Sequence, residues 1–503
     1  MTMPRSLSLS ISQWVLGFLV ALSIPAFLAN AAWASPKRPH STQGLFGHRR
    51  FVGLSEGSSK LFAKMDAGFF SQKLDHFSVR DQQKFSQRFA IYTDFASQPL
   101  ESATVLYYFC GEWTCTESDA LWKVPSGIVS HAKELGAVLV ILEHRYYGKS
   151  RPFNDLLPEH MKYLSYEQAL EDFADFERYA RQTYGLNGPW ISIGGSYPGA
   201  LSAYFRQQHP ELVVGALSSS GVVRTVDSFE DYDRMVAEGL GTQCLKAVQD
   251  GTSQIEQSLT DPKTLSKIAE LFNEPQITDG RDLLAVVANT ADGAVQYGLQ
   301  EKFCEDVLST DPLDGLAKAS LDKAVNPGRF DRSMNGSMDD STPASSDSGD
   351  PGDSEDAPTD EDSWQYQMCT QFGGFIVPYH DSSKRVQSAL LDLDYETSPC
   401  KDLFGISTPP PTDKINRKFY KPLLDSATSH ILFVNGSMDP YSVLSIATRN
   451  GNDTNPNIET ALIDGGSHCI DFSTFLSNPD TLGALVTAFQ SHFVSVAKEW
   501  FVN

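Results

Sequence analysis

The stretch WISIGGSYPGALSAYF, residues 190–205, joins an apolar run to an alanine-rich run through two glycines and a serine. The first run has the composition of a buried strand, and the second favours a helix. A serine at such a junction resembles the G-x-S-x-G turn that presents a nucleophile, but Pro198 stands where the last glycine should be, and Gly199 comes one residue late. Ser196 is therefore either a nucleophile or a small residue in a tight turn.

Further apolar runs on both sides of this junction predict the other strands of one sheet. Amphipathic stretches separate several of the runs, notably residues 165–185, and a helix is expected to close the chain over residues 481–501. Strands that are apolar on both faces and alternate with helices form a parallel sheet covered by helices, which is an α/β fold. The expected strands lie within residues 104–109, 137–143, 190–194, 213–219, 430–440 and 459–472.

The sheet pattern is interrupted between residues 226 and 425, where the chain reads first as helices and then as an irregular, aromatic-rich stretch. We therefore expect a helical cap domain inserted into one α/β domain. Within the insertion, residues 338–362 carry ten Asp or Glu and no Lys or Arg, which is typical of a disordered segment; calcium binding is the alternative. The expected parts are a signal peptide (1–34), the α/β domain (45–225 and 426–503) and the cap (226–425) with its acidic insertion (331–363).

Three residues occur in the order that serine hydrolases of α/β type use, each shortly after an expected strand. Ser196 would be the nucleophile, Asp439 the orienting carboxylate and His468 the general base. Because the carboxyl ends of parallel strands meet at one edge of a sheet, the three should converge there. Taken singly, Asp439 could start a turn and His468 could lie on the surface. Four other histidines compete with His468, namely His144, His380, His430 and His492.

The misplaced proline is compatible with this interpretation. Two residues after the nucleophile, the chain is in the first turn of the following helix, where proline loses no hydrogen bond.

The N–H of Tyr197 is the expected first oxyanion donor. The second should come from Gly111 or Glu112, in the loop FCGEWTC, unless that loop is only a disulfide-pinned turn.

The N-terminus and the cysteines indicate an oxidising compartment. A basic start, an apolar run and the small residues Ala32 and Ala34 predict a cleaved signal peptide, with a single membrane anchor as the alternative. Seven cysteines suggest the pairs Cys110–Cys115, Cys244–Cys304 and Cys369–Cys400, leaving Cys469. Asn335 and Asn452 are candidate glycosylation sites, whereas the formal match at Asn435 lies in an expected core strand.

The net charge of −23 argues against nucleic-acid binding. Nothing in the sequence calls for a metal or a cofactor, no membrane contact is expected after removal of the signal peptide, and a homodimer is left open.

Several motifs together resemble the serine peptidases that include lysosomal Pro-Xaa carboxypeptidase, dipeptidyl peptidase II and thymus-specific serine protease. The likeness runs from about residue 66 to the C-terminus, and the GGSYPG variant looks most like the thymus-specific branch. The motifs are GGSYPGALSAYFR, EHRYYGKS (143–150), FSQKLDHF (70–77), KFSQRF (84–89), LSYEQALEDFADF (164–176), WQYQMCTQFG (364–373), NGSMDP and GGSHCIDF.

The resemblance implies an α/β-hydrolase fold with a helical cap, a triad of Ser196, Asp439 and His468, and cleavage of short peptides from one end, often after proline. It also suggests an acidic pH optimum, which would require the pKa of His468 to be held low. In relatives the loop after the strand expected within residues 104–109 usually reads GGEG or GNEG, whereas here it reads CGEWTC. Gln371 stands where relatives commonly have Glu. Trp364, Tyr366 and Gln367 are candidates for a proline-accepting pocket, or for ordinary cap core.

The main expectation is a serine exopeptidase whose substrates are peptides. A lipase or esterase on the same fold and a catalytically silent binding protein are the alternatives.

Overall fold

The computed structural model describes residues 65–118, 121–122, 124–326, 358–447, 455–473 and 481–501. The expected signal peptide, most of the acidic insertion, and the candidate glycosylation sites Asn335 and Asn452 lie outside these residues. Within them, no helix is long and apolar enough to cross a membrane.

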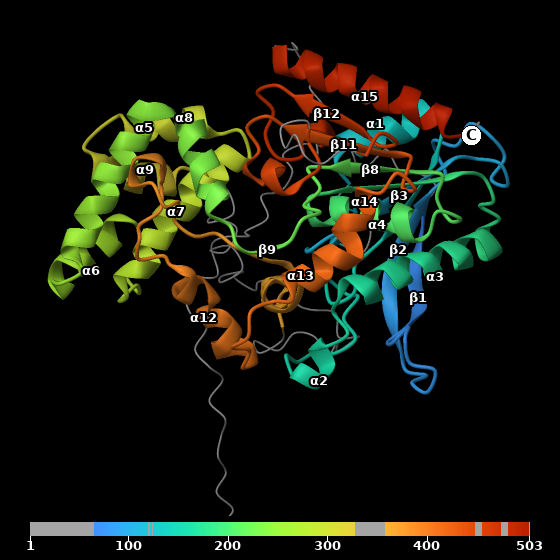
Figure 1. Cartoon of the computed structure of the whole chain (residues 1–503), viewed down its shortest axis with the longest axis horizontal. Coiled ribbons are helices and arrows are strands. Elements are labelled where there is room, and N and C mark those ends of the chain that lie inside the picture. The colour runs from blue at the N-terminus through green and yellow to red at the C-terminus, as the bar shows by residue number, and fades with distance from the viewer. Residues whose placement is uncertain are drawn as a thin grey trace, which may run out of the picture. The chain divides into compact units, whose positions relative to one another are not determined.

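A mixed eight-stranded sheet organises the described chain (Figure 1). Its strand order is β1-β2-β6-β3-β7-β8-β11-β12; β1, β2 and β6 pair antiparallel, and every pair from β6 to β12 is parallel. This is the α/β-hydrolase arrangement, which confirms the expected fold. The strands are β1 (Met65–Lys73), β2 (Lys84–Tyr92), β3 (Val105–Phe109), β6 (Val138–Leu142), β7 (Trp190–Gly195), β8 (Gly215–Ser219), β11 (Ile431–Gly436) and β12 (Glu459–Ile463).

Helices cover both faces of the sheet, which is why its central strands are apolar throughout. Alternate residues of β3 point to opposite faces: Tyr107 and Phe109 pack with one set of helices, Leu106 and Tyr108 with the other. The first set is α3 (Tyr166–Tyr184) and α4 (Tyr197–Gln208), and the second is α1 (Ser126–Leu135) and α15 (Thr481–Glu499).

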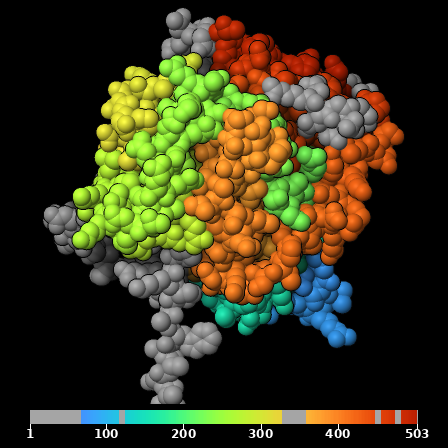
Figure 2. Space-filling view, turned by 60° about the vertical axis from the view of Figure 1, so that its left-hand side comes forward, coloured from blue at the N-terminus to red at the C-terminus, as the bar shows by residue number. Residues whose placement is uncertain are grey.

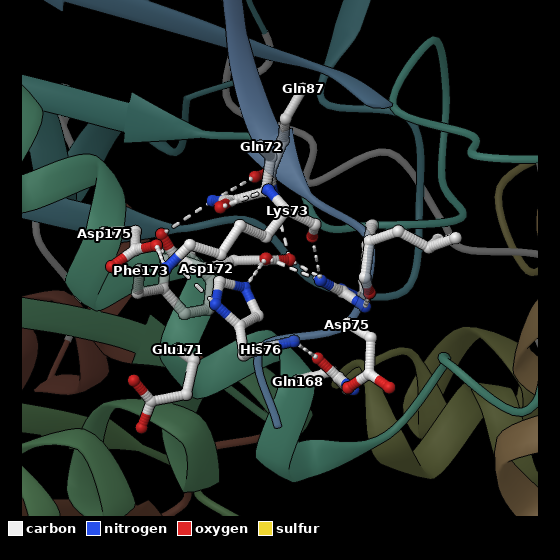
Figure 3. A network of polar contacts seen from close by, with 12 residues as sticks. Gln72, Lys73, Asp75, His76, Gln87, Gln168, Glu171, Asp172, Phe173 and Asp175 are labelled. Carbon is white, nitrogen blue, oxygen red and sulfur yellow. Dashed lines mark hydrogen bonds and ion pairs between the residues drawn. The ribbon is translucent and has the colours of Figure 1, made fainter. Parts of the chain in front are cut away.

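The β1–β2 hairpin at the sheet edge was not among the strands predicted from the sequence. Its buried residues include polar ones: Gln72 and Gln87 hydrogen-bond each other at 3.0 Å. Figure 3 shows these side chains beside His76 and Asp172, and Asp172 in turn pairs with His76 at 2.7 Å and with Arg145 at 2.6 Å. Buried amides and charges hide the apolar alternation by which a strand is usually recognised.

Between β8 and β11 the chain leaves the sheet and forms a helical segment. Helices α5 to α9 pack together (Figure 1), and Figure 2 shows the orange residues from about 360 to 430 lying against them. The buried carboxylate of Asp233 on α5 accepts the N–H groups of Tyr379, Val386 and Gln387, which joins the two halves. The helices are α5 (Glu230–Ser258), α6 (Pro262–Leu271), α7 (Gly280–Gln296), α8 (Gln300–Val307), α9 (Pro312–Leu321), α11 (Asp360–Gln367) and α12 (Leu393–Phe404).

Short elements complete the described chain. β9 pairs parallel with β10 inside the segment where we expected no strand, and β4 pairs with β5. α11 runs directly into a π-helical turn over Met368–Phe372. The short elements are α2 (Pro158–Met161), α13 (Thr412–Ile415), α14 (Lys421–Leu423), β4 (Thr116–Ser118), β5 (Leu121–Trp122), β9 (Val226–Ser228) and β10 (Gly373–Phe375).

We expected a disordered insertion over residues 331–363, and this predicted boundary is wrong at its C-terminal end, where the last residues belong to α11. A capping box between Thr359 and Asp362 starts α11, and Asp360 pairs with Arg151 at 2.6 Å. The carboxylate of Asp360 also accepts the N–H groups of Thr114 and Gly148. The last acidic residues of the run are therefore helix-capping and docking groups, which composition alone does not distinguish from a solvated tail.

The three expected disulfides are present. They join Cys110 to Cys115, Cys244 to Cys304, and Cys369 to Cys400, whereas Cys469 is buried without a disulfide. Asn435 lies buried in β11, as expected from its place in a core strand.

Candidate active site

Ser196 lies at the sharp turn between β7 and α4. Its backbone has φ +61° and ψ −127°, a conformation that non-glycine residues rarely adopt. The N–H of Ser196 donates to the carbonyl of Ser219 at 2.9 Å, and its own carbonyl accepts from Ala200 at 3.1 Å. These bonds hold the strained turn between two buried elements, so the serine is presented at the carboxyl end of β7.

Small residues make this turn sterically possible. A Cβ at Gly194 would lie 2.2 Å from the carbonyl oxygen of Pro198, and one at Gly195 would lie 2.9 Å from the sulfur of Cys469. Pro198 is in the first turn of α4, where its missing N–H costs no helical bond. The proline that departs from the expected pattern is thus accommodated as we predicted.

Asp439 and His468 are paired directly in the site. Nδ1 of His468 lies 2.9 Å from each carboxylate oxygen of Asp439, and both side chains are buried. Asp439 follows β11 and is itself fixed by the N–H of Tyr441, which donates to it at 2.9 Å. A carboxylate facing Nδ1 favours the tautomer that leaves Nε2 unprotonated and able to accept a proton.

The pKa of His468 is governed by two opposing effects. Burial favours the neutral imidazole, but the Asp439 carboxylate outweighs burial and raises the pKa well above its ordinary value. A base with a raised pKa is protonated in acid. The acidic optimum suggested by the resemblance is therefore not favoured by the free site.

Residues next to Ser196 and His468 in the chain contact each other. Cys469 contacts Gly195, as described above, and its N–H donates to the hydroxyl of Ser220 at 2.9 Å. Within the described residues, the Ser196 side chain is not hydrogen-bonded to His468. The structure thus brings the three predicted residues to one edge of the sheet and joins two of them directly.

His144, one of the competing histidines, has a different place. Its Nε2 lies 3.0 Å from the hydroxyl of Tyr197, and its Nδ1 lies 2.7 Å from the carbonyl of Arg145. Burial lowers the pKa of His144 to about 4, so the ring is neutral, donates through Nδ1 and accepts from Tyr197. The Arg145 side chain pairs with Asp172, which holds Arg145 in place. Arg145 in turn holds His144, and His144 holds Tyr197, the residue next to the nucleophile. In the sequence, Arg145 was marked only by the EHRYYGKS motif.

The loop after β3 lies directly against the nucleophile turn. A Cβ on Gly111 would be 2.4 Å from the ring of Pro198, so the loop and α4 touch there. Glu112 is buried, and its pKa is influenced by the charge of His468. Of the three residues expected to form the oxyanion hole, Tyr197 follows Ser196 directly, Gly111 contacts the nucleophile turn at Pro198, and Glu112 is the next residue of the same loop.

The candidate pocket residues on α11 do not all face the same way. The ring of Trp364 meets that of Tyr197 edge-on, with 5.6 Å between centroids, and Gln367 accepts a hydrogen bond from the hydroxyl of Tyr147. Tyr366 packs instead against Phe404 on α12, 5.3 Å between centroids. Trp364 and Gln367 therefore adjoin the residue after the nucleophile, whereas the described ring contact of Tyr366 lies within the cap.

Residues 72–483 match the family described as serine carboxypeptidase S28. The chain belongs to this family. It is 32% identical over 422 residues to the probable serine protease EDA2 of Arabidopsis thaliana, a match that covers 78% of this chain and 79% of that protein. It is 26% identical over 498 residues to the human thymus-specific serine protease, covering 92% of each chain. Lysosomal Pro-X carboxypeptidase of Mus musculus is 28% identical over 440 residues, covering 80% of this chain and 83% of that one.

Membership of the S28 family confirms the family predicted from the motifs. The chain is a serine-type peptidase on an α/β-hydrolase fold, and its substrates are peptides. The S28 peptidase carries no cluster of His, Cys, Asp and Glu suited to a metal ion within its described residues.

Proposed function

We propose that this S28 peptidase is an exopeptidase that cleaves short peptides at bonds following proline, with Ser196 as nucleophile, His468 as general base and Asp439 as orienting carboxylate. The observation that carries the triad is the pairing of Nδ1 of His468 with both oxygens of Asp439. The positive φ of Ser196 at the end of β7 supports its part.

The proposed reaction needs two acyl transfers. The Ser196 hydroxyl attacks the scissile carbonyl carbon while Nε2 of His468 takes its proton, and the imidazolium then gives that proton to the leaving amine as the C–N bond breaks. Water repeats the sequence on the acyl-enzyme and releases the acid. The N–H of Tyr197 at the start of α4 is the proposed first donor to the oxyanion, with the loop of Gly111 and Glu112 opposite.

The preference for proline is proposed from the aromatic surface beside Tyr197. Trp364 offers a flat indole next to the nucleophile turn, and an aromatic face suits a pyrrolidine ring. One relative carries the name lysosomal Pro-X carboxypeptidase, which agrees with this assignment. Tyr366 and Gln367 would support Trp364 from the same helix rather than contact the ring themselves.

The proposed location is a secretory or lysosomal compartment. Three disulfides in the described chain fit an oxidising environment, and the relatives with lysosomal names point the same way.

The direction of cleavage can be tested by mass spectrometry of products. Five peptides are compared. Four carry one internal Pro-Xaa bond and have both ends free, the amino end acetylated, the carboxyl end amidated, or both ends blocked; the fifth has free ends and alanine in place of proline. A carboxypeptidase still cleaves the peptide with the acetylated amino end, whereas a dipeptidyl peptidase still cleaves the peptide with the amidated carboxyl end. Equal cleavage of the proline and alanine peptides would contradict the proposed specificity, and cleavage with both ends blocked would contradict exopeptidase action.

A further inference from the structure

Glu112 is a buried acid beside the triad that the reaction above does not use. Its side chain is 5% exposed, and within the described residues Oε2 has no hydrogen-bond partner. It sits in a six-residue loop that the Cys110–Cys115 disulfide closes and that touches α4 at Gly111. A buried polar atom without a partner is costly, and such atoms concentrate where a ligand supplies the missing bond.

Few charged groups act on the carboxyl of Glu112. The one basic group that interacts with it electrostatically is His468, and no lysine or arginine does so among the described residues. The remaining titratable groups that it influences are phenols on five elements or loops: Tyr108, Tyr147, Tyr166, Tyr197 and Tyr441. All of these phenols have raised pKa values and are neutral.

Burial raises the pKa of Glu112 to about 8, and it does so against the opposing effects of its own backbone N–H and of His468. The carboxyl is therefore protonated at neutral pH. The backbone N–H of Glu112 acts on its own carboxyl, and its expected role as an oxyanion donor stays a prediction. The O–H of the neutral acid is another donor that this residue can offer.

We propose that the neutral carboxyl of Glu112 donates a hydrogen bond to the scissile carbonyl oxygen of the substrate as that oxygen gains negative charge. The inference rests on the proposed acyl transfer at Ser196. Its geometric basis is the contact of Gly111 with Pro198, the burial of Glu112 in the adjoining loop position and the unpartnered oxygen of its carboxyl. A buried acid kept neutral so that it can donate to an oxyanion is an established device in other enzymes.

The competing assignment for Glu112 is an ionised carboxylate that binds the ammonium group of a peptide. That assignment needs the charged form, which burial disfavours. The two assignments differ in what glutamine can replace: its amide N–H donates as the acid does, but it cannot balance an ammonium charge.

The experiment compares Glu112→Gln and Glu112→Ala with the wild-type full chain, using a Pro-Xaa peptide from pH 5 to pH 9. We expect the glutamine variant to keep kcat within about threefold at pH 6.5, and the alanine variant to lose about 100-fold, the scale of one oxyanion donor. The fall in wild-type activity above about pH 8 should vanish in the glutamine variant. Glu177→Gln is the matched control, because burial raises the pKa of Glu177 to about 7 in α3, and it should leave this fall unchanged.

Labelling by a fluorophosphonate probe and thermal unfolding show whether each variant is folded and whether Ser196 still reacts. Two results would overturn the proposal: a glutamine variant as slow as the alanine variant at every pH, or an alanine variant as fast as wild type. Loss of the alkaline fall in Glu177→Gln would also overturn it. An active Ser196→Ala variant would instead refute the proposed function itself, whatever the Glu112 variants show.

Discussion

The backbone N–H of His468 donates a hydrogen bond of 2.9 Å to the carbonyl of Gln296, the last residue of α7 in the inserted helical segment. The side chain of Gln296 is held in turn by the hydroxyl of Tyr232, which donates to it at 2.7 Å. Gly298, just beyond α7, lies close to Ser467. The inserted helices therefore support the histidine loop directly, in addition to adjoining the nucleophile turn through α11.

Removing the support for Gln296 should slow the chemical step. Tyr232→Phe deletes one buried hydrogen bond, worth about 1 kcal/mol, so we expect kcat to fall by up to about fivefold while KM changes little. Tyr395→Phe is the control, because Tyr395 also donates from the inserted segment but to Asp282, away from His468. Steady-state kinetics check this. A KM effect without a kcat effect, or equal effects in both variants, would contradict a positioning role.

The Asp439–His468 pair should set the acid side of the pH profile. In the wild type the carboxylate raises the pKa of His468, so the unprotonated base is lost as pH falls, beginning above the ordinary value of 6.5. Asp439→Asn removes this effect, and kcat should drop by about 10⁴-fold while the acid limb moves to lower pH. The pH dependence of kcat/KM measures both. An acid limb that stays in place would mean that another group titrates.

The contact between Gly111 and Pro198 should tolerate no added atom. A Cβ would lie 2.4 Å from the proline ring and 2.9 Å from Trp113, so Gly111→Ala should destabilise the fold by about 1–3 kcal/mol and reduce activity. Gly68→Ala is the control, since its nearest neighbours would be an ordinary 3.6 Å away. Denaturant unfolding and peptide hydrolysis test this, and two variants of equal stability would refute the tight packing.

The small disulfide should matter more for activity than for stability. Cys110 and Cys115 are five residues apart, so replacing both by serine should cost about 2 kcal/mol, whereas the loop of the Cys244–Cys304 disulfide predicts about 4 kcal/mol. The first loop carries Gly111 and Glu112, the second lies in the inserted helices. We expect the Cys244/Cys304 double variant to lose more thermal stability, and the Cys110/Cys115 double variant to lose more peptide hydrolysis. The same order in both measurements would argue against a role of the loop in the site.

The central sheet could be predicted from the sequence because its strands are buried on both faces and read as continuous apolar runs. β3, β6, β7, β8 and β11 all match expected segments. The β1–β2 hairpin could not, since Gln72 and Gln87 point inward and satisfy each other only in the folded state.

The triad could be named from the sequence, because nucleophile, carboxylate and base each follow a strand end in a fixed order. The contacts by which other parts of the fold support the triad could not be predicted. The support of His468 by Gln296 is a contact between segments about 170 residues apart, and it leaves no local pattern. The neutral state proposed for Glu112 likewise depends on its burial in the folded chain. Tertiary burial of this kind is not visible in a motif.

Labelling of the full chain with a fluorophosphonate probe, followed by mass spectrometry of the modified peptide, tests the central claim most directly. Ser202→Ala is the matched control, since Ser202 lies in α4 and bonds Ser192 away from the turn. We expect a single adduct on Ser196 in the wild type and in Ser202→Ala, and neither adduct nor peptide hydrolysis in a folded Ser196→Ala variant. Hydrolysis that persists in Ser196→Ala would contradict the claim.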